Sequence, residues 1–567
     1  MPYASPVKDF DFLLSHVLDF KSVQETNVFA EATDDMAAAI MTEAARLCDE
    51  VLAPLNRAGD LHPAHLENGV VRTSPGFADG YRAIADGGWI GIASAPEYGG
   101  MGLPLTLATA VNDMMAGACL SLQLNPLMTQ GQIEALEKHA SDEIKSLYLP
   151  KLISGEWCGT MNLTEPQAGS DVGALTTRAV PNEDGTYAIT GQKIYISWGD
   201  NDFTGNVCHL VLARLPDGAT GTKGISLFMV PKWLPDTNGE PGEKNALRVV
   251  SLEHKTGLHG SPTAVMSYEG ATGWLVGAPH GGMAAMFTMM NNARLGVGTQ
   301  GIGIAEGAYQ HALAYAQDRK QGRAGGTGAI IEHADVRRML ATMKADTFAA
   351  RAIALDCAIS LDIATATADP AATARAAFLT PIAKAFGTET GISVANMGIQ
   401  VHGGMGFIEE TGASQYLRDV RVTAIYEGTN GIQAMDLVGR KLMDGGEAAF
   451  ALLEEIETGA ENARAQHPDL AEAVWQSAET LREATETLLS RDAADRMGAA
   501  VPFLMGFARV LGGHYHLAAA CHGDTQRQRL ARFYITRLLP EHAGYLAQVH
   551  APNDSLMDVT PDDLAAI

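Results

Sequence analysis

The chain has 567 residues, of which 46% are hydrophobic and 19% are charged. Its length exceeds a single hydrophobic core and indicates three or four domains, and its composition is typical of well-packed globular proteins. The formal charge of −26 argues against a nucleic-acid binder, which needs a basic surface. Any polyanionic ligand must therefore be bound by local arginines and helix N-termini.

The sequence lacks the features that mark secretion, membrane insertion or metal binding. The six cysteines are scattered, without C-x-x-C or H-E-x-x-H spacing, so neither a disulfide framework nor a metal site is predicted. Residues 1–20 contain no apolar signal-peptide core. No run of about 18 apolar residues is present, which is the length that a membrane span requires. We therefore expect a cytoplasmic protein with no membrane span.

Hydrophobic periodicity separates the first half of the chain into three regions. Residues 1–35 form a short N-terminal extension with one or two helical turns, and residues 36–155 follow the helical period. Within the latter, the spacing predicts an apolar helix over 105–122. Residues 156–278 change to short alternating runs separated by Gly, Asp, Asn and Pro clusters, which predicts a β-domain.

The helical period returns in the second half of the chain. Residues 279–445 predict a bundle of long helices over 283–317, 335–362 and 371–401. Residues 446–567 are acidic and again helical, and they form an additional domain. The predicted fold class is thus α+β multi-domain: an N-terminal helical domain, a middle β-barrel domain, a C-terminal helical bundle and an additional C-terminal helical domain.

One glycine motif has the wrong context for a nucleotide site. Residues 296–301 match G-x-G-x-x-G literally, but helical sequence flanks them and no strand precedes them. A dinucleotide fingerprint requires a preceding strand. We predict instead that these small residues let two helices approach closely.

The segment 424–433 places one carboxylate, Glu427, between an apolar run and a glycine-rich turn. A carboxylate held partly out of water has a raised pKa, which suits it to proton abstraction. The neighbouring glycines allow the backbone to approach a planar or phosphate-bearing ligand. The same residues are equally compatible with an acidic surface loop beside an ordinary turn.

Two segments of the predicted β-domain could hold such a ligand. Residues 161–171 offer a hydroxyl, a Gly-Ser turn and free backbone N–H groups, which suit a ring edge and a pyrophosphate. In residues 191–197, Tyr195 and Ser197 share a strand face, so an aromatic ring could cover a planar cofactor while a hydroxyl bonds its edge. Taken singly, each segment is also compatible with a plain turn or strand.

From about residue 36 to 445, the chain resembles the acyl-CoA dehydrogenase family. The segment 163–171 resembles the first family signature, and 400–407 followed by 426–429 resembles the second, in family order and at family spacing. The resemblance implies a helix, β-barrel, helix architecture that binds FAD, with each flavin shared between two subunits. It also implies oxidation of an acyl-CoA to the 2,3-enoyl-CoA.

The resemblance implies a role for Glu427 as the base that removes the α-proton of the acyl-CoA. Some relatives carry this base instead just before an arginine that matches Arg294, but Ala293 stands there and cannot serve. Arg294 and Asn291 resemble positions that hold the CoA portion. The further implied substrate contacts are Ser170, Tyr426 and Gly428.

The flavin contacts implied by the resemblance fall into two groups. Those from the same subunit are Met161, Leu163, Thr164, Gly169, Ser170, Tyr195, Ser197, Thr429 and Gly431. Those from the neighbouring subunit, facing pyrophosphate and adenosine, are Arg319, Gln321, Gln400, Gly403 and Gly404. Two positions depart from the family pattern, because Tyr195 stands in place of a common tryptophan and Gly431 in place of a frequent glutamine.

The extra C-terminal domain resembles that of large bacterial members. Residues 1–6 and 258–263 resemble a branch that converts 3-methylmercaptopropionyl-CoA, a short thioether ester, to the methylthioacryloyl ester. Other acyl-CoA substrates, an oxidase activity and a DNA-binding flavoprotein on the same fold are the alternatives. The expected partners are an electron-transfer flavoprotein and further copies of this chain, as a dimer or dimer of dimers, without nucleic acid or membrane.

Overall fold

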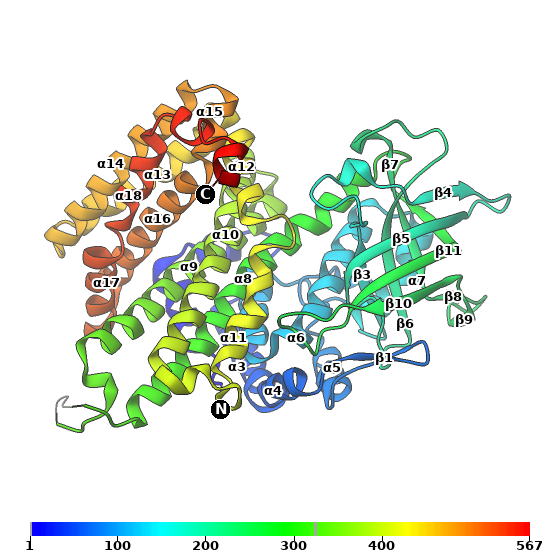
Figure 1. Cartoon of the computed structure of the whole chain (residues 1–567), viewed down its shortest axis with the longest axis horizontal. Helices are drawn as coiled ribbons and strands as arrows, with labels where there is room; N and C mark the ends of the chain where they lie inside the picture. The colour runs from blue at the N-terminus through cyan, green and yellow to red at the C-terminus, as the bar shows by residue number, and fades with distance from the viewer. Residues whose placement is uncertain (1–2, 323–325, 567) are drawn as a thin grey trace.

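A computed structural model describes residues 3–322 and 326–566 (Figure 1). The helices of the second half of the chain lie on one side and the β-strands on the other, with α6 (Leu105–His139) between them. This arrangement confirms the predicted order of helical, β and helical regions. The other helices of the first 155 residues are α1 (Val7–Phe12), α2 (Phe20–Gln24), α3 (Asp34–Arg46), α4 (Ala53–Leu61), α5 (Phe77–Asp86) and α7 (Asp142–Ile153).

The sequence predicts helices throughout residues 36–155, but the structure also contains two short strands there. A short hairpin of β1 (His65–Glu67) and β2 (Val70–Arg72) interrupts this region. Asn68 and Gly69 form the turn with φ values of 52° and 77°. An Asn-Gly pair between two short runs is a strong hairpin signal, because both central residues of such a turn need positive φ. This signal was present in the sequence and was missed.

Helix α6 is longer than predicted. It does not end at Leu122 but continues to His139, with a break at Cys119, where φ is −157° and ψ is 86°. Its most apolar window satisfies the length and composition of a membrane span, but 94% of that window is buried inside the protein. Burial against α8 (Gly282–Asp318) and β3 (Trp157–Asn162) therefore accounts for its apolar composition.

The β-domain closes on itself. β7 pairs with both β6 and β11, so β11, β5, β4, β6 and β7 form a ring that β3 and β10 extend. This topology agrees with the predicted barrel. The strands are β3 (Trp157–Asn162), β4 (Arg178–Pro181), β5 (Tyr187–Ser197), β6 (Asn206–Arg214), β7 (Ile225–Pro231), β8 (Trp233–Pro235), β9 (Pro241–Lys244), β10 (Leu247–Leu252) and β11 (Thr263–Val276).

Three long helices, α8 (Gly282–Asp318), α9 (Ala334–Thr367) and α10 (Pro370–His402), form the bundle and match the predicted helices closely. The glycine motif lies in the middle of α8 and confirms the prediction of a close helix contact. A Cβ at Gly298 would lie 2.6 Å from the Ala383 carbonyl oxygen, and one at Gly301 would lie 2.4 Å from that of Gly387. Only glycine permits this approach of α8 to α10.

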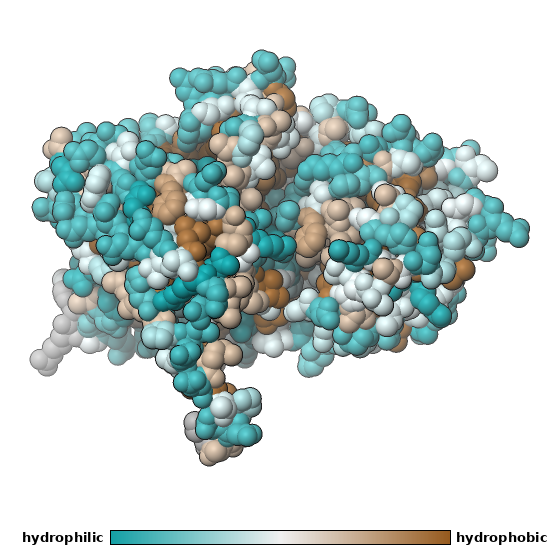
Figure 2. Space-filling model, turned by 90° about the horizontal axis from the view of Figure 1, so that it is seen from above, coloured by the Kyte–Doolittle hydropathy of each residue, from teal (hydrophilic) through white to brown (hydrophobic). Residues whose placement is uncertain are grey.

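The additional domain packs on the bundle through polar as well as apolar contacts. Arg509 of α16 forms a buried ion pair with Asp346 of α9, and the Tyr515 hydroxyl donates to Asp356. The remaining helices are α11 (Ala413–Val420), α12 (Asn430–Gly439), α13 (Glu447–Ala463), α14 (Pro468–Ser490), α15 (Ala493–Gly498), α16 (Ala500–His522), α17 (Thr525–Arg537), α18 (Glu541–His550), α19 (Asp554–Met557) and α20 (Pro561–Ala566). α19 and α20 are exposed and stand away from the body in Figure 2.

A large groove of about 1540 Å³ lies between the N-terminal extension, α9 and α17. Its basic residues are Lys8, Arg337, Arg338, Lys344, Arg527, Arg529 and Arg537, against the acids Asp9, Asp11, Glu332, Asp335 and Asp524. Within the described residues, these acids other than Asp11 are engaged in ion pairs, hydrogen bonds or a helix cap. We name it the basic groove. Only its α17 side belongs to the additional domain, which is acidic in composition as predicted.

Candidate active site

Glu427 lies in a tight turn that leads into α12. Its φ is 57° and that of Gly428 is 83°, so a glutamate occupies the left-handed region that normally favours glycine. The turn is held by Thr429, whose hydroxyl accepts the Ile432 N–H at 3.3 Å. Gln433 Nε2 donates to the carbonyl oxygens of Glu427 and Gly428 at 3.1 and 3.3 Å. Such a strained residue persists because its surroundings fix it.

Burial raises the pKa of Glu427 from its ordinary value of 4.5 to about 7, against the opposing effect of Arg294 and Lys384. Arg294 belongs to α8 and Lys384 to α10, so the close packing of these helices brings both cations toward one carboxylate. A carboxylate with a pKa near neutrality is a competent base at physiological pH. Within the described residues, the Glu427 N–H has no hydrogen-bond acceptor and is free to donate to a ligand.

Lys384 is a residue that the sequence analysis missed. Its side chain is fully buried, and its Nζ donates to Asn430 Oδ1 at 2.9 Å, three residues beyond Glu427. Asn430 Nδ2 in turn donates to Glu389 Oε1 at 2.7 Å. Burial lowers the pKa of Lys384 to about 8. The available signal was a lysine inside the apolar run 382–386 of a predicted helix.

Arg294 lies in the interior rather than at the surface. It is 7% exposed, and its Nη1 lies 3.5 Å from Asp436 Oδ2 and 3.4 Å from Asn291 Oδ1. Its Nε has no hydrogen-bond partner within the described residues. The predicted partner Asn291 is exposed, one turn before Arg294 on the same helix. Arg294 therefore faces the candidate base, and Asn291 faces the outside.

The loop after β3 carries Leu163, Thr164, Gly169 and Ser170 and is braced from beneath by a buried ion pair. Lys193 Nζ lies 2.8 Å from Glu165 Oε1 and donates to the Leu163 carbonyl oxygen at 2.9 Å. Although burial opposes ionisation, the Lys193 charge holds the pKa of Glu165 down at about 2. Gly169 and Ser170 remain exposed above this brace.

The predicted aromatic platform is present on β5. The pairing of β5 with β11 shifts register between Ala264 and Met266 of β11. Tyr195 of β5 lies at this shift, and its φ is 60°. Such a bulge re-aims a side chain, and the Tyr195 ring is 62% exposed while Ile196 beside it is buried. Ser197 is partly exposed. This alternation agrees with the predicted common face of Tyr195 and Ser197.

The second predicted group of flavin contacts does not join the first. Arg319 follows the last residue of α8, 25 residues after Arg294, so the two lie ~38 Å apart at a rise of about 1.5 Å per residue. Gln321 is exposed on the following segment 319–333, which we name the arm. Gln400, Gly403 and Gly404 are exposed at the end of α10 and in the turn after it. Within one chain, Arg319 therefore lies far from Arg294 and the candidate base beside it.

The residues present fit the FAD that the resemblance implies. A Cβ at Gly169, Gly403 or Gly404 would meet no atom within 4 Å, so the backbone is open to a ligand at each of these positions. The exposed Tyr195 ring offers an apolar face for a planar ring system. Gly431 also lies in the turn, one residue after the start of α12, while Met161 is partly buried at the end of β3.

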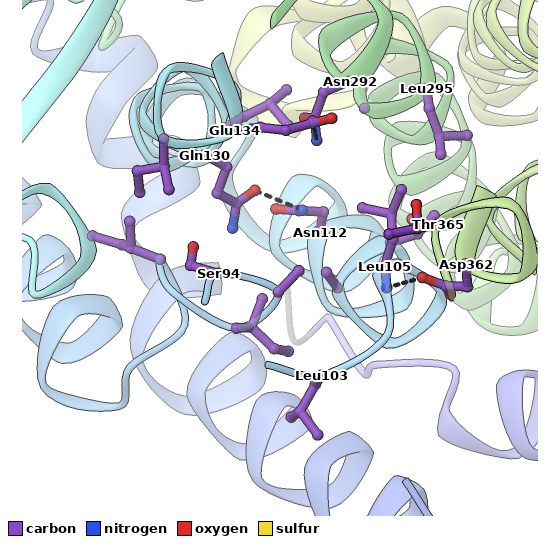
Figure 3. Close-up of a pocket in the computed structure, with 18 of the residues that line it drawn as sticks. Ser94, Leu103, Leu105, Asn112, Gln130, Glu134, Asn292, Leu295, Asp362 and Thr365 are labelled. Carbon is purple, nitrogen blue, oxygen red and sulfur yellow. Dashed lines mark hydrogen bonds between the residues drawn. The ribbon is translucent and has the colours of Figure 1, made fainter. Parts of the chain in front are cut away.

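A separate cavity of about 190 Å³ lies between the two halves of α6, the segment 90–94 and α8 (Figure 3). Its lining is about half apolar and half polar, and Asn112 Nδ2 donates to Gln130 Oε1 at 3.0 Å on its wall. The residues predicted for substrate and flavin are not among those that line it. We name it the α6 pocket.

Family models match almost the whole chain. They are the acyl-CoA dehydrogenase N-terminal domain over residues 34–156, the middle domain over 160–271 and the C-terminal domain over 280–443. A fourth model, described as acetyl-CoA dehydrogenase C-terminal like, matches residues 452–560 of the additional domain.

Among curated proteins, 3-methylmercaptopropionyl-CoA dehydrogenase of Ruegeria pomeroyi is 46% identical over 521 residues, covering 89% of this chain and 88% of the relative. Among solved structures, Caenorhabditis elegans ACDH-11 in complex with C11-CoA has a TM-score of 0.79 at 21% identity, covering 95% of this chain and 92% of its own. The Bacillus anthracis acyl-CoA dehydrogenase complexed with FAD has a TM-score of 0.76 at 20% identity, covering 98% and 93%.

At such low identity the two solved structures show the fold alone, whereas the family models and the curated relative carry the assignment. The resemblance found in the sequence is thereby confirmed. The chain belongs to the acyl-CoA dehydrogenase family, whose members are FAD-dependent oxidoreductases that act on CH–CH bonds.

Proposed function

We propose that this enzyme oxidises a short acyl-CoA to the 2,3-enoyl-CoA, with Glu427 as the base and 3-methylmercaptopropionyl-CoA as the substrate that fits best. The observation that carries the chemistry is the Glu427 carboxyl, held in a left-handed turn with its pKa raised to about 7. The substrate assignment is supported by the 46% identical relative and by residues 258–263. Of the similar opening segment 1–6, residues 1 and 2 lie outside the described residues.

In the proposed mechanism, Glu427 removes the α-proton of the thioester as its carboxylate. An α-C–H bond is a weak acid, so the thioester oxygen needs a donor as negative charge develops on it. The free N–H of Glu427 supplies one such donor. Bound FAD supplies the acceptor for the β-hydride. After transfer Glu427 holds the proton, and the cations Arg294 and Lys384 favour its release.

The cofactor is proposed to sit on the loop after β3 and on β5. Thr164, Ser170 and Ser197 would bond its ring edge or ribityl chain, and Tyr195 would cover one face of the ring. Met161 and Leu163 would border the ring, and Thr429 and Gly431 would complete the cradle from the Glu427 turn. Because the arm lies too far away, Arg319 and Gln321 would serve the flavin of another copy, together with Gln400, Gly403 and Gly404.

The proposed partners follow from this arrangement. We propose a homo-oligomer in which a second copy of the chain supplies the arm, with an electron-transfer flavoprotein as the electron acceptor. The proposed compartment is the cytoplasm, with neither nucleic acid nor membrane as a partner.

The decisive experiment is anaerobic flavin reduction of the holoenzyme across a panel of acyl-CoAs that includes the 3-methylmercaptopropionyl ester. Bleaching of the flavin by short esters, fastest with the thioether ester, is the expected result. Absence of bleaching by every ester would overturn the proposed function. Adding oxygen to the reduced, product-bound enzyme separates the alternatives, because fast reoxidation would identify an oxidase.

A further inference from the structure

Buried amides connect the Tyr426 side chain to the α6 pocket through five hydrogen bonds in series. The Tyr426 hydroxyl donates to Gln300 of α8, and each amide then donates to the next acceptor. The following bonds are Gln300 to Gln123 at 2.9 Å, Gln123 to Asn112 at 3.1 Å, Asn112 to Gln130 at 3.0 Å and Gln130 to the Trp89 carbonyl oxygen at 3.1 Å. We name this series the amide chain.

The amide chain runs through the buried interface between α6 and α8. Gln300 is fully buried, Gln123 is 1% exposed and Asn112 is 6% exposed. Each amide accepts through its oxygen and donates through its nitrogen, so all five bonds have the same direction and polarise one another. Removing one member leaves its neighbours as unpaired polar groups in the core, which is unfavourable. The chain is therefore rigid.

The Tyr426 end of the amide chain adjoins the candidate base. Tyr426 directly precedes Glu427, so fixing the tyrosine ring limits how the left-handed turn can rotate. Gln433, which is also fully buried, holds the carbonyl oxygens of Glu427 and Gly428 from the other side. Two buried glutamines thus hold the turn in place. Gln300 accepts from the Tyr426 hydroxyl, and Gln433 donates to the backbone of Glu427 and Gly428.

From this geometry we infer that Gln300 and Gln123 are positioning residues for Glu427, which they hold in place through the Tyr426 ring. The inference rests on the proposed function, because it assigns Glu427 the role of base. Neither glutamine touches the reacting atoms. Their effect on the rate comes from the placement of the carboxylate, since a displacement of about 1 Å can slow an enzyme about 100-fold.

The charged groups around Glu427 belong to other elements. Arg294 faces it from α8 and Lys384 from α10, while Asp436 and Arg440 of α12 lie behind Arg294 and Glu389 lies behind Lys384. The amide chain contains none of them. Replacing Gln300 by an apolar residue of similar size therefore removes no charge, and any change in the pH profile reports the position and hydration of Glu427.

The test compares Gln300→Met with Gln132→Met in the holoenzyme. Gln132 is an equally buried glutamine of α6, but it donates to the Cys208 carbonyl oxygen of the β-domain at 3.1 Å. For Gln300→Met we expect unchanged FAD content and flavin reduction slowed about 10- to 100-fold. The acid limb of its pH profile should move to lower pH, because a loosened turn admits water to Glu427. Gln132→Met should keep the wild-type rate constant and pH limb.

An unchanged rate constant and pH limb in Gln300→Met would overturn the inference. If Gln300→Met does not fold, Tyr426→Phe decides, because it deletes only the hydroxyl and keeps the ring; the same slowing is expected, and a wild-type rate would overturn the inference. Where both variants fold, the double variant should be no slower than the slower single one, whereas additive effects would refute coupling through this bond. Failure of wild-type flavin reduction with every ester would instead refute the proposed function.

Discussion

The Glu427 turn and the arm belong to the same chain and are built in opposite ways. The turn is gripped by buried side chains and surrounded by charges from two helices, whereas Arg319 and Gln321 of the arm are exposed. The start of the arm is held mainly by backbone hydrogen bonds, such as the one from the Ile330 N–H to the Arg319 carbonyl oxygen at 2.8 Å. The candidate base is thus held by contacts within one chain, whereas under the proposed function the exposed arm would serve the flavin of another copy.

The largest effect is expected from a substitution in the Glu427 turn that leaves the arm unchanged. Glu427→Gln should keep bound FAD and the affinity for CoA but slow flavin reduction by substrate on the order of 10³-fold, because no base remains. Anaerobic absorbance bleaching measures this directly. Bleaching at the wild-type rate in this variant would remove Glu427 from the mechanism.

The next largest effect is expected from a substitution in the arm that leaves the Glu427 turn unchanged. Arg319→Ala should weaken FAD retention about 10- to 100-fold through loss of a charge-assisted hydrogen bond. Flavin content after dilution or dialysis measures it. Arg82→Ala, which alters an exposed arginine elsewhere, is the control and should retain FAD.

Mixing the two variants sharpens the comparison further. If the arm serves another copy, oligomers that combine a Glu427→Gln chain with an Arg319→Ala chain regain one intact site. Activity should then appear on mixing at limiting FAD. Purely additive activity after subunit exchange would show that each chain closes its own flavin site.

The pH dependence tests the charges around the turn. The base acts as a carboxylate with a pKa of about 7, so flavin reduction should rise about tenfold per pH unit below 7 and level off above it. Lys384→Met removes a cation that favours the carboxylate, so the limb should move to higher pH and the rate at neutral pH should fall several-fold. The exposed Lys21 provides the control variant Lys21→Met, and a limb at the same pH in Lys384→Met would contradict this role.

The smallest expected effect is on stability. Folding raises the pKa of Glu427 above its ordinary value of 4.5, so this group's contribution to stability is fully present below about 4.5 and is lost as pH rises through about 7. Glu427→Gln escapes that loss. Because Glu427 is partly exposed and solvent screens its charge, we expect only about 1 kcal/mol of gain over the wild type at alkaline pH relative to acid pH. Urea unfolding at both pH values measures it. Arg319→Ala in the exposed arm should show no such dependence.

Long periodic segments made most of the fold predictable from the sequence. The helices over 283–317, 335–362 and 371–401 lie close to where they were expected, because small residues and apolar spacing decide such elements. The hairpin at Asn68-Gly69 was missed because its strands are three residues long and its local turn signal was weighed too little. The continuation of α6 past Leu122 depends on burial against α8, which no local pattern shows.

The candidate site was predictable only where a signature covers it. Glu427, Thr164 and Tyr195 stand in motifs that assign them a role. Lys384 stands in no motif, and Gln300 and Gln433 lie in the segments 296–301 and 424–433 without a role that the pattern assigns. Their importance arises from helix packing, which turns them inward and gives them partners far away in sequence, such as Gln300 and Tyr426. Helices of this length are apolar on nearly all sides, so one sequence does not show which of their side chains point toward the site.

The basic groove gives this acidic molecule an uneven charge distribution. A protein with a net charge of −26 repels its copies at long range, but a local cationic surface attracts the acidic faces of others at contact. The Debye length grows from about 8 Å at physiological ionic strength to about 30 Å in dilute buffer, so the balance between these forces depends on salt. Light scattering across a salt series will therefore report both colloidal attraction and subunit assembly. It reports subunit assembly alone only at salt concentrations that screen the charges of the groove.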